Sequence, residues 1–95
     1  MIETLSPTGD LDELVLGALQ ADLEAFSDDT DLVLDFTEVT FCGSGCIRLL
    51  IETSNRLKGG GGSLIIRNAR SIVRRAFSVG AVDFLLEPEP PDNPA

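Results

Sequence analysis

The sequence predicts an α/β domain in which a single layer of mixed or parallel β-sheet packs with about three to four helices. Short apolar runs at residues 32–36 and 64–66 fit buried strands. They alternate with longer segments whose apolar residues recur at three- and four-residue steps, as in amphipathic helices. This alternation favours parallel strand pairs with right-handed crossovers. The domain is expected to span residues 1–86, and a disordered tail rich in acids and prolines to follow at residues 87–95.

The first half of the chain is expected to contain an edge strand, a helix and a central strand. Ile2–Leu5 fits a short edge strand, which residues 7–9 end. A helix is expected from Asp10, with Asp10 and Glu13 in a capping arrangement at its start. Its apolar stripe consists of Leu11, Val15, Leu19, Leu23 and Phe26. After a polar turn, residues 32–36 suit a parallel strand that is buried on both faces.

A second helix is expected to begin near Ser44, after a connecting loop at residues 37–43. Its inner side carries Ile47, Leu50, Ile51 and Leu57, and its outer side carries Arg48, Glu52, Asn55 and Arg56. Lys58 and the four glycines that follow it end this helix and form a flexible turn.

The remaining elements are expected to be a strand, a helix and a strand. Residues 64–66 form a buried strand, and Asn68 caps a third helix that Gly80 ends. The inward-facing residues of this helix are Ile72, Val73, Ala76 and Phe77. Residues 82–86 then supply the last strand.

The charge of the chain limits its function. The net charge is −9, and residues 1–47 hold 11 acids and no base, whereas residues 48–75 hold seven bases and one acid. An acidic total argues against nucleic-acid binding, because phosphate contacts need an extended basic surface. The basic segment is interpreted as solvated helix faces, with contact to an acidic protein as the alternative.

Catalysis is not expected, because the chain contains no histidine and Ser44 therefore has no histidine partner. Two cysteines without histidine also do not supply a conventional zinc site, so neither a metal nor a cofactor is expected. No apolar run reaches the length of a membrane-spanning helix, and no targeting signal follows Met1. We therefore expect no membrane insertion and a cytoplasmic location.

The two cysteines, Cys42 and Cys46, are four residues apart. A bridge between them would close a very short loop, so reduced thiols are expected, in keeping with a cytosolic protein. The start of a helix favours a thiolate, which leaves a redox-sensitive contact as the alternative.

Residues 32–47 resemble the signature of the STAS domain, in which a buried strand and a short loop precede a helix opened by Asp-Ser-Ser/Thr-Gly-Leu. Here the opening reads Gly43, Ser44, Gly45, Cys46 and Ile47, so that Ser44 stands on the first serine. Residues 9–12, Gly-Asp-Leu-Asp, are similar to a Gly-Glu-Leu-Asp turn of the family, and Gly61-Gly62 to its glycine pair before a strand. The resemblance covers the chain from about Thr8 to Leu86 and implies the STAS fold.

This resemblance implies a function as well. In the anti-sigma-factor antagonists of the family, the partner anti-sigma kinase phosphorylates that serine, and its state decides whether the two proteins bind. The implied role of the chain is to bind an anti-sigma factor with serine-kinase activity and so release a sigma factor for transcription. Ser44 is the implied phosphorylation site of a bacterial phosphoprotein. The implied partner-binding residues are Asp12, Gly43, Ser44, Gly45, Cys46, Arg48 and Glu52.

Two departures from the family motif keep an alternative open. Gly43 stands where the motif has aspartate, and Cys46 stands where it has glycine. The alternative is a constitutive accessory subunit that packs on an ATPase, like the STAS-type component of bacterial lipid-transport ABC complexes. In that case Ser44 serves only as a helix cap.

A phosphate on Ser44 is expected to change binding rather than folding. It would lie beside the positive end of a helix, which is locally favourable. Asp10, Asp12 and Asp35 are expected nearby, so the added charge would chiefly repel an acidic partner surface. Only eight residues precede Gly9, too few for the paired opening strands that the resemblance implies, so either an exposed sheet edge or a shortened chain is expected. An exposed edge would favour a homodimer.

Overall fold

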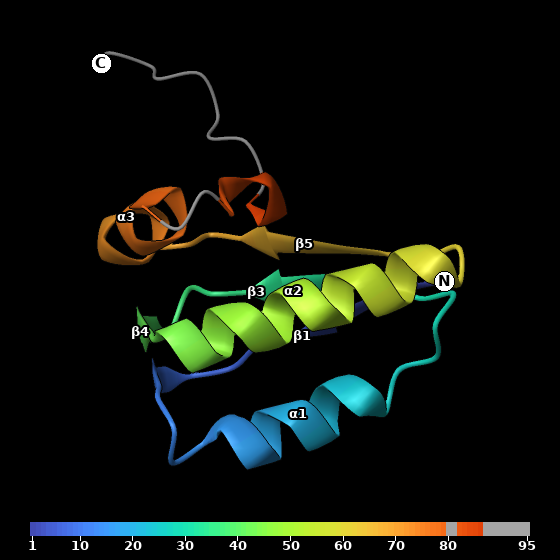
Figure 1. Ribbon diagram of the computed structural model, residues 1–95, viewed down its shortest axis with the longest axis horizontal. Coiled ribbons are helices and arrows are strands. Elements are labelled where there is room, and N and C mark those ends of the chain that lie inside the picture. The colour runs from blue at the N-terminus through green and yellow to red at the C-terminus, as the bar shows by residue number, and fades with distance from the viewer. Residues whose placement is uncertain (80–81, 87–95) are drawn as a thin grey trace.

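The computed structural model describes residues 1–79 and 82–86. Its strands form two sheets, and within each sheet the strands run parallel (Figure 1). β1 (Ile2–Leu5), β3 (Asp31–Asp35) and β5 (Ser63–Arg67) form a three-stranded sheet with β3 in the centre. β2 (Gly9–Leu11) and β4 (Val39–Cys42) form a two-stranded sheet. Within the described part of the chain, all three pairings between these strands are parallel, as the alternation of strands and helices predicts.

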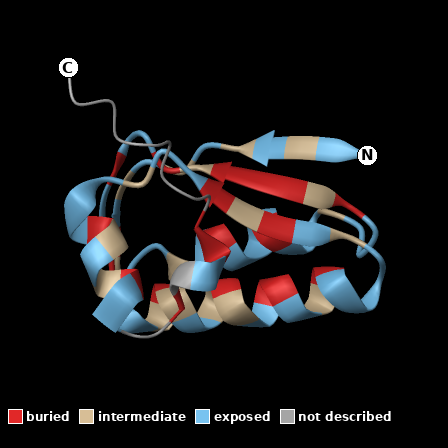
Figure 2. Cartoon of the chain, turned by 90° about the horizontal axis from the view of Figure 1, so that it is seen from above, coloured by how far each residue is buried: buried red, intermediate tan, exposed pale blue. Residues whose placement is uncertain are grey.

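Three α-helices and a short 3-10 helix accompany these strands in the described residues. They are α1 (Leu16–Glu24), α2 (Ser44–Gly59), α3 (Ser71–Val79) and η1 (Asp83–Leu85). α2 runs along one face of the three-stranded sheet and turns its buried residues toward the strands (Figure 2). α1 packs against α2, and α3 packs against β4. No helix within residues 1–79 and 82–86 has the length and apolar character needed to cross a membrane.

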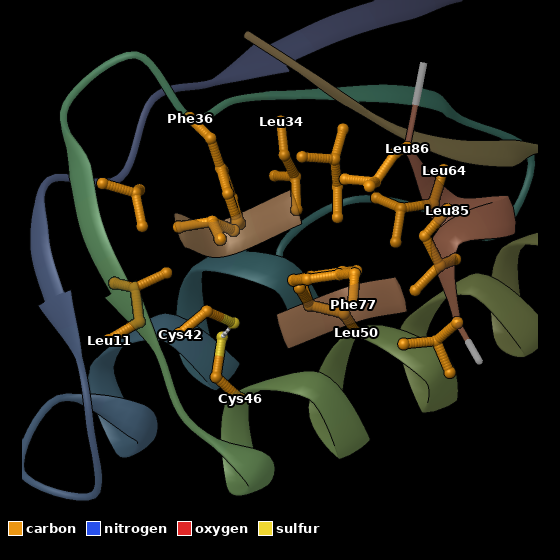
Figure 3. Close-up of a cluster of buried hydrophobic side chains, with 14 of the residues drawn as sticks. Leu11, Leu34, Phe36, Cys42, Cys46, Leu50, Leu64, Phe77, Leu85 and Leu86 are labelled. Atoms are coloured by element: carbon orange, nitrogen blue, oxygen red, sulfur yellow. Dashed lines mark hydrogen bonds between the residues drawn. The ribbon is translucent and has the colours of Figure 1, made fainter. Parts of the chain in front are cut away.

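The core lies where the sheets meet α2 and α3 (Figure 3). Leu34, Phe36, Leu50 and Phe77 are all fully buried there. Within β3, Leu32, Val33 and Leu34 are buried, which confirms the expected central strand. β1 lies at one edge of its sheet, as Ile2–Leu5 predicts. The helix expected near Ser44 and the strand expected around residues 64–66 are also present.

The helix expected from Asp10 begins later. Residues 9–11 form β2 instead, and α1 starts at Leu16. The expected cap is therefore wrong: Asp10 accepts a hydrogen bond from the Thr40 hydroxyl, and the backbone N–H of Leu14 bonds to Asp12. Leu11 is buried because it pairs with β4, so its four-residue spacing from Val15 does not reflect a shared helix.

Three other expectations about single elements are also wrong. Residues 37–43 contain β4 rather than only a loop. Residues 82–86 contain η1, and Leu86 forms an isolated parallel bridge with Ile66 rather than a strand. Asn68 has a positive φ of 63° and bonds to Asp35, and α3 begins three residues later, so Asn68 is not its cap.

Two of the expected helix faces also need correction. On α3, Val73 and Phe77 are buried, but Ile72 is 64% exposed. On α2, Arg56 is half-buried rather than outside, and Thr53 and Ser54 are buried beside the apolar residues. The residues that the expectations place at Gly80 and in the tail at 87–95 lie outside the described residues.

The glycine segment after α2 is a hydrogen-bonded turn. Gly60 is the C-cap, Gly61 has a φ of 93°, and the N–H of Gly62 donates to the carbonyl of Leu57 over 2.7 Å. The N–H of Gly61 donates to the carbonyl of Lys58 over 3.3 Å. These two bonds and the left-handed glycine make a Schellman motif, which satisfies the last carbonyls of the helix.

Candidate functional site at the start of helix α2

Ser44 is the first residue of α2, and its side chain is exposed. Gly43 occupies the N-cap position in an extended conformation, and no side chain caps the helix. Ser44 therefore lies one residue beyond the position that the helix-cap interpretation assigned to it. The first N–H groups of α2 have no capping side chain, which makes this helix end a favourable place for negative charge.

The parallel pairing of β2 and β4 brings the site together. Leu11 at the end of β2 pairs with Cys42 at the end of β4, and the N–H of Gly43 donates to the carbonyl of Leu11 over 3.3 Å. Since the two strands end at the same edge, the residues after each strand meet there. Asp12 thus comes to lie close to Ser44, although 32 positions separate them in the sequence.

A hollow of about 220 Å³ lies at this edge. Its walls come from the end of β2, the segment that leads into α1, β4 and the start of α2. The residues that line it are Leu11, Asp12, Glu13, Leu16, Phe41, Gly43, Ser44, Gly45 and Cys46. The structure therefore gathers five of the seven expected partner-binding residues around one concave surface.

The remaining two expected residues lie farther along α2. Arg48 and Glu52 are exposed and stand four and eight positions after Ser44, on successive turns of the helix. Glu52 lines a separate hollow together with Thr53 and Arg56. A partner that contacts Ser44, Arg48 and Glu52 would therefore follow the axis of α2.

Of the three acids expected around Ser44, only Asp12 lines the hollow. Asp10 bonds to Thr40. Asp35 accepts hydrogen bonds from the hydroxyl and backbone N–H of Thr37 and from Asn68. These bonds, above all the one from the Thr37 hydroxyl, hold the pKa of Asp35 below its ordinary value. Its carboxylate thus organises the end of β3.

Four residues that line the hollow were not expected as site residues, namely Leu11, Glu13, Leu16 and Phe41. Phe41 is 47% exposed although it is aromatic and lies in a strand. An alternating strand pattern does not indicate it, because Thr40 and Phe41 are both exposed between the buried Val39 and Cys42. Leu16 was not expected at the site because a helix from Asp10 would place it inside the helix rather than at its first residue.

Close packing at the hollow depends on its two glycines. A Cβ on Gly43 would lie 3.2 Å from the Phe41 ring, and a Cβ on Gly45 would lie 2.8 Å from a methyl group of Leu16. The side chains of Phe41 and Leu16 therefore approach the backbone around Ser44 more closely than larger residues would allow. This makes the rim of the hollow partly apolar.

Cys42 and Cys46 lie on the core side of this site, 4% and 1% exposed. The Sγ atoms are 2.8 Å apart, with Cys42 as donor (Figure 3). The hydrogen bond to Cys46, and then burial, raise the pKa of the Cys42 thiol. Both cysteines are free thiols, as expected. Within residues 1–79 and 82–86 no three potential ligand side chains gather to hold a metal ion.

The parallel sheets, the helices on them and a serine at the start of α2 are typical of a STAS domain. The family model described as "Mlab, STAS domain" matches residues 3–87, and the chain belongs to this family. No curated protein matches it.

Among solved structures, the anti-sigma factor antagonist SpoIIAA in its unphosphorylated form is similar, with a TM-score of 0.78 and 16% sequence identity. The match covers 95% of this chain and 81% of SpoIIAA. The two proteins therefore share the STAS fold.

Proposed function

We propose that this chain is an anti-sigma-factor antagonist in which Ser44 is the phosphorylatable switch. It binds an anti-sigma factor with serine-kinase activity in the bacterial cytoplasm and so regulates transcription. The observation that carries this proposal is the exposed Ser44 at the first residue of α2, beside a hollow that Asp12 also lines. Membership in the STAS family and the fold shared with an antagonist support it.

The surface around Ser44 suits a protein partner better than a small substrate. Phe41, which is 47% exposed, and Leu16 both line the hollow beside Ser44. The carboxylates of Asp12 and Glu13 belong to residues that line the same hollow, and the exposed Arg48 lies one turn farther along α2. Apolar and aromatic groups within a charged rim are typical of protein interfaces. Cys46 is buried, so it contributes to the shape of this surface rather than to its contacts.

Phosphorylation of Ser44 is expected to leave the fold intact. The phosphate would lie at the uncapped start of α2, where the helix dipole favours negative charge. Arg48 stands four positions later on the same helix and is within the reach of an i, i+4 pair. On the other side, Asp12 and Glu13 line the hollow and would repel the phosphate. The charge of the binding surface would therefore change more than its conformation.

The first test is phosphorylation itself. Incubation with native cell extract and ATP should add about 80 Da to the wild-type chain and nothing to Ser44→Ala. Ser71→Ala is the matched control, because Ser71 is also an exposed serine at the first residue of an α-helix. Phosphate on the Ser44→Ala variant, or none on the wild type in an extract with an active anti-sigma kinase, would contradict the proposal.

The second test is binding to the anti-sigma factor recovered with the wild-type chain. Ser44→Asp should weaken this binding by about tenfold or more, equivalent to about 1.4 kcal/mol, because it places a charge beside Asp12 and Glu13. Its melting temperature should stay close to that of the wild type, and Ser71→Asp should bind normally. Equal affinities of the wild type and Ser44→Asp would count against the switch.

A constitutive accessory subunit is the second candidate, and Gly43 and Cys46 favour it because they replace two residues of the family motif. In this case the domain packs on a transport ATPase and Ser44 carries no phosphate. Co-purification of a transport ATPase with an unmodified chain would support this function over the first.

A further inference from the structure

The buried cysteine pair has no part in the proposed phosphorylation. Cys42 is the last residue of β4, and Cys46 lies in the first turn of α2. Their Sγ atoms are 2.8 Å apart, which is within about 0.8 Å of the length of a disulfide bond. The side chains point toward one another from two different elements (Figure 3). A small movement of either element would therefore bring the sulfurs to bonding distance.

The residues between the two cysteines are Gly43, Ser44 and Gly45. Two of these three residues are glycines, whose backbone adapts to a changed end-to-end distance more easily than that of other residues. When a bond forms between the sulfurs, the backbone of the segment that carries Ser44 would therefore adjust its conformation. The N–H of Gly43, which bonds to Leu11, lies within this segment.

The hollow borders Cys46 and is the side from which a small oxidant would approach the pair. Cys46 is 1% exposed but lines the hollow of about 220 Å³ together with Ser44 and Asp12. A molecule the size of hydrogen peroxide fits in a space of this volume, since one water molecule takes up about 30 Å³ in the liquid. Cys42 lies behind Cys46, within hydrogen-bonding distance of it.

We propose that Cys42 and Cys46 form a reversible dithiol–disulfide pair that responds to hydroperoxides and fixes the conformation of the segment around Ser44. The dithiol is the resting state, as in other proteins of a reducing compartment.

The oxidation proceeds in two balanced steps. The Cys46 sulfur, as thiolate, attacks one oxygen of hydrogen peroxide, the O–O bond breaks, and Cys46 becomes a sulfenic acid while hydroxide leaves and takes up the thiol proton as water. The Cys42 sulfur then attacks the sulfenic sulfur, the S–S bond forms, and the hydroxyl leaves with the Cys42 proton as a second water. Two thiols and one hydrogen peroxide thus give one disulfide and two waters. A small dithiol reverses the reaction by thiol–disulfide exchange.

The expected consequence is local. The disulfide ties the end of β4 to the first turn of α2 and restricts the Gly43–Gly45 backbone between them. Any effect of this on kinase or partner access rests on the proposed function of Ser44. Formation of the disulfide does not, so the two proposals can fail separately.

Mass spectrometry of the purified chain tests the disulfide. Peroxide treatment should lower the intact mass by about 2 Da and abolish alkylation of both cysteines after unfolding, and dithiothreitol should restore both readouts. Cys46→Ala should show no loss of mass. An unchanged wild-type mass, stable gains of oxygen atoms without a disulfide, or disulfide-linked dimers would each overturn the proposal.

Nuclear magnetic resonance tests the local effect on the same wild-type sample, without relying on a variant that has an altered core. Backbone amide signals of residues 42–46 should shift on oxidation and return on reduction, while those of β1 stay in place. Shifts spread evenly over the chain, or none near Ser44, would overturn the proposed control of this segment.

Discussion

At Gly62, the absence of a side chain lets two segments of backbone touch. A Cβ at this position would lie 2.1 Å from the carbonyl oxygen of Thr30 and 2.9 Å from that of Asp28. The neighbouring N–H of Ser63 donates to the same Thr30 carbonyl over 3.0 Å, which fixes the spacing between the segments. Since the obstacles are backbone atoms, rotation of a side chain does not relieve the clash.

We expect Gly62→Ala to lower the free energy of unfolding by about 2 kcal/mol or more, because the turn must move away from Thr30. Gly59→Ala is the matched control. Gly59 is the last residue of α2, and a Cβ there meets nothing within 4 Å. This variant should be neutral or more stable by up to about 1 kcal/mol. Urea unfolding of both variants measures the difference, and equal stabilities would show that the turn yields freely.

The candidate site illustrates what a sequence shows at the scale of single residues. Gly43, Ser44 and Gly45 are adjacent, so one motif predicted them together, and their positions at the start of α2 agree with it. Asp12 was found by resemblance alone, since only the β2–β4 pairing brings it to the hollow. Phe41 carried no local signal of its own.

At the scale of elements, Arg56 connects α2 to the end of α1 and the turn that follows it. Its guanidinium donates to the carbonyl oxygens of Leu23 and Phe26 over 2.9 and 3.1 Å, and it forms an ion pair with Asp28. The carbonyl of Leu23 belongs to the last turn of α1 and also accepts a bond from the backbone N–H of Phe26 over 3.3 Å. Arg56 bonds to the same oxygen, since a carbonyl oxygen has two lone pairs. Arg56 on α2 thus supplies a hydrogen-bond donor to the C-terminal end of α1.

Arg56→Ala should lower the free energy of unfolding by about 2 kcal/mol, because two charge-assisted bonds to carbonyl oxygens are lost. Arg48→Ala is the control on the same helix, since this exposed arginine should change stability by less than about 0.5 kcal/mol. Asp28→Ala removes only the ion pair and so measures its contribution alone. This pair is exposed and contributes less than about 1 kcal/mol. If Asp28→Ala cost as much as Arg56→Ala, the carbonyl contacts would not be the source of stability.

The elements differ in how far the sequence predicted them. β3 and β5 have continuous apolar runs, and α2 has a long apolar stripe, so their places were evident. β2 and β4 have three and four residues, too few for a periodic pattern, and they are stabilised by each other rather than by their own sequence. The stripe of the first helix was extended backward to Leu11 because a buried strand residue at a four-residue spacing looks like a helical one.

At the scale of the whole molecule, negative charge exceeds positive charge by nine. The excess is concentrated in the first 47 residues, which hold 11 acids and no base. These residues form β1 to β4 and α1, so folding brings the acids together within one small domain. Repulsion among them opposes the compact state, and Arg56–Asp28 is an ion pair that acts in the other direction.

Salt should therefore raise the melting temperature of this protein. Between about 0.01 and 0.1 M NaCl the Debye length falls from about 30 to about 10 Å, which screens repulsion across the acidic half more than it weakens a contact ion pair. We expect a rise of a few degrees, measured by circular dichroism at neutral pH. Glu38→Lys, at an exposed position in that half, should melt higher at low salt and respond less to added NaCl. A melting temperature that falls as NaCl is added would mean that attractive pairs, rather than net repulsion, dominate the electrostatics of the fold.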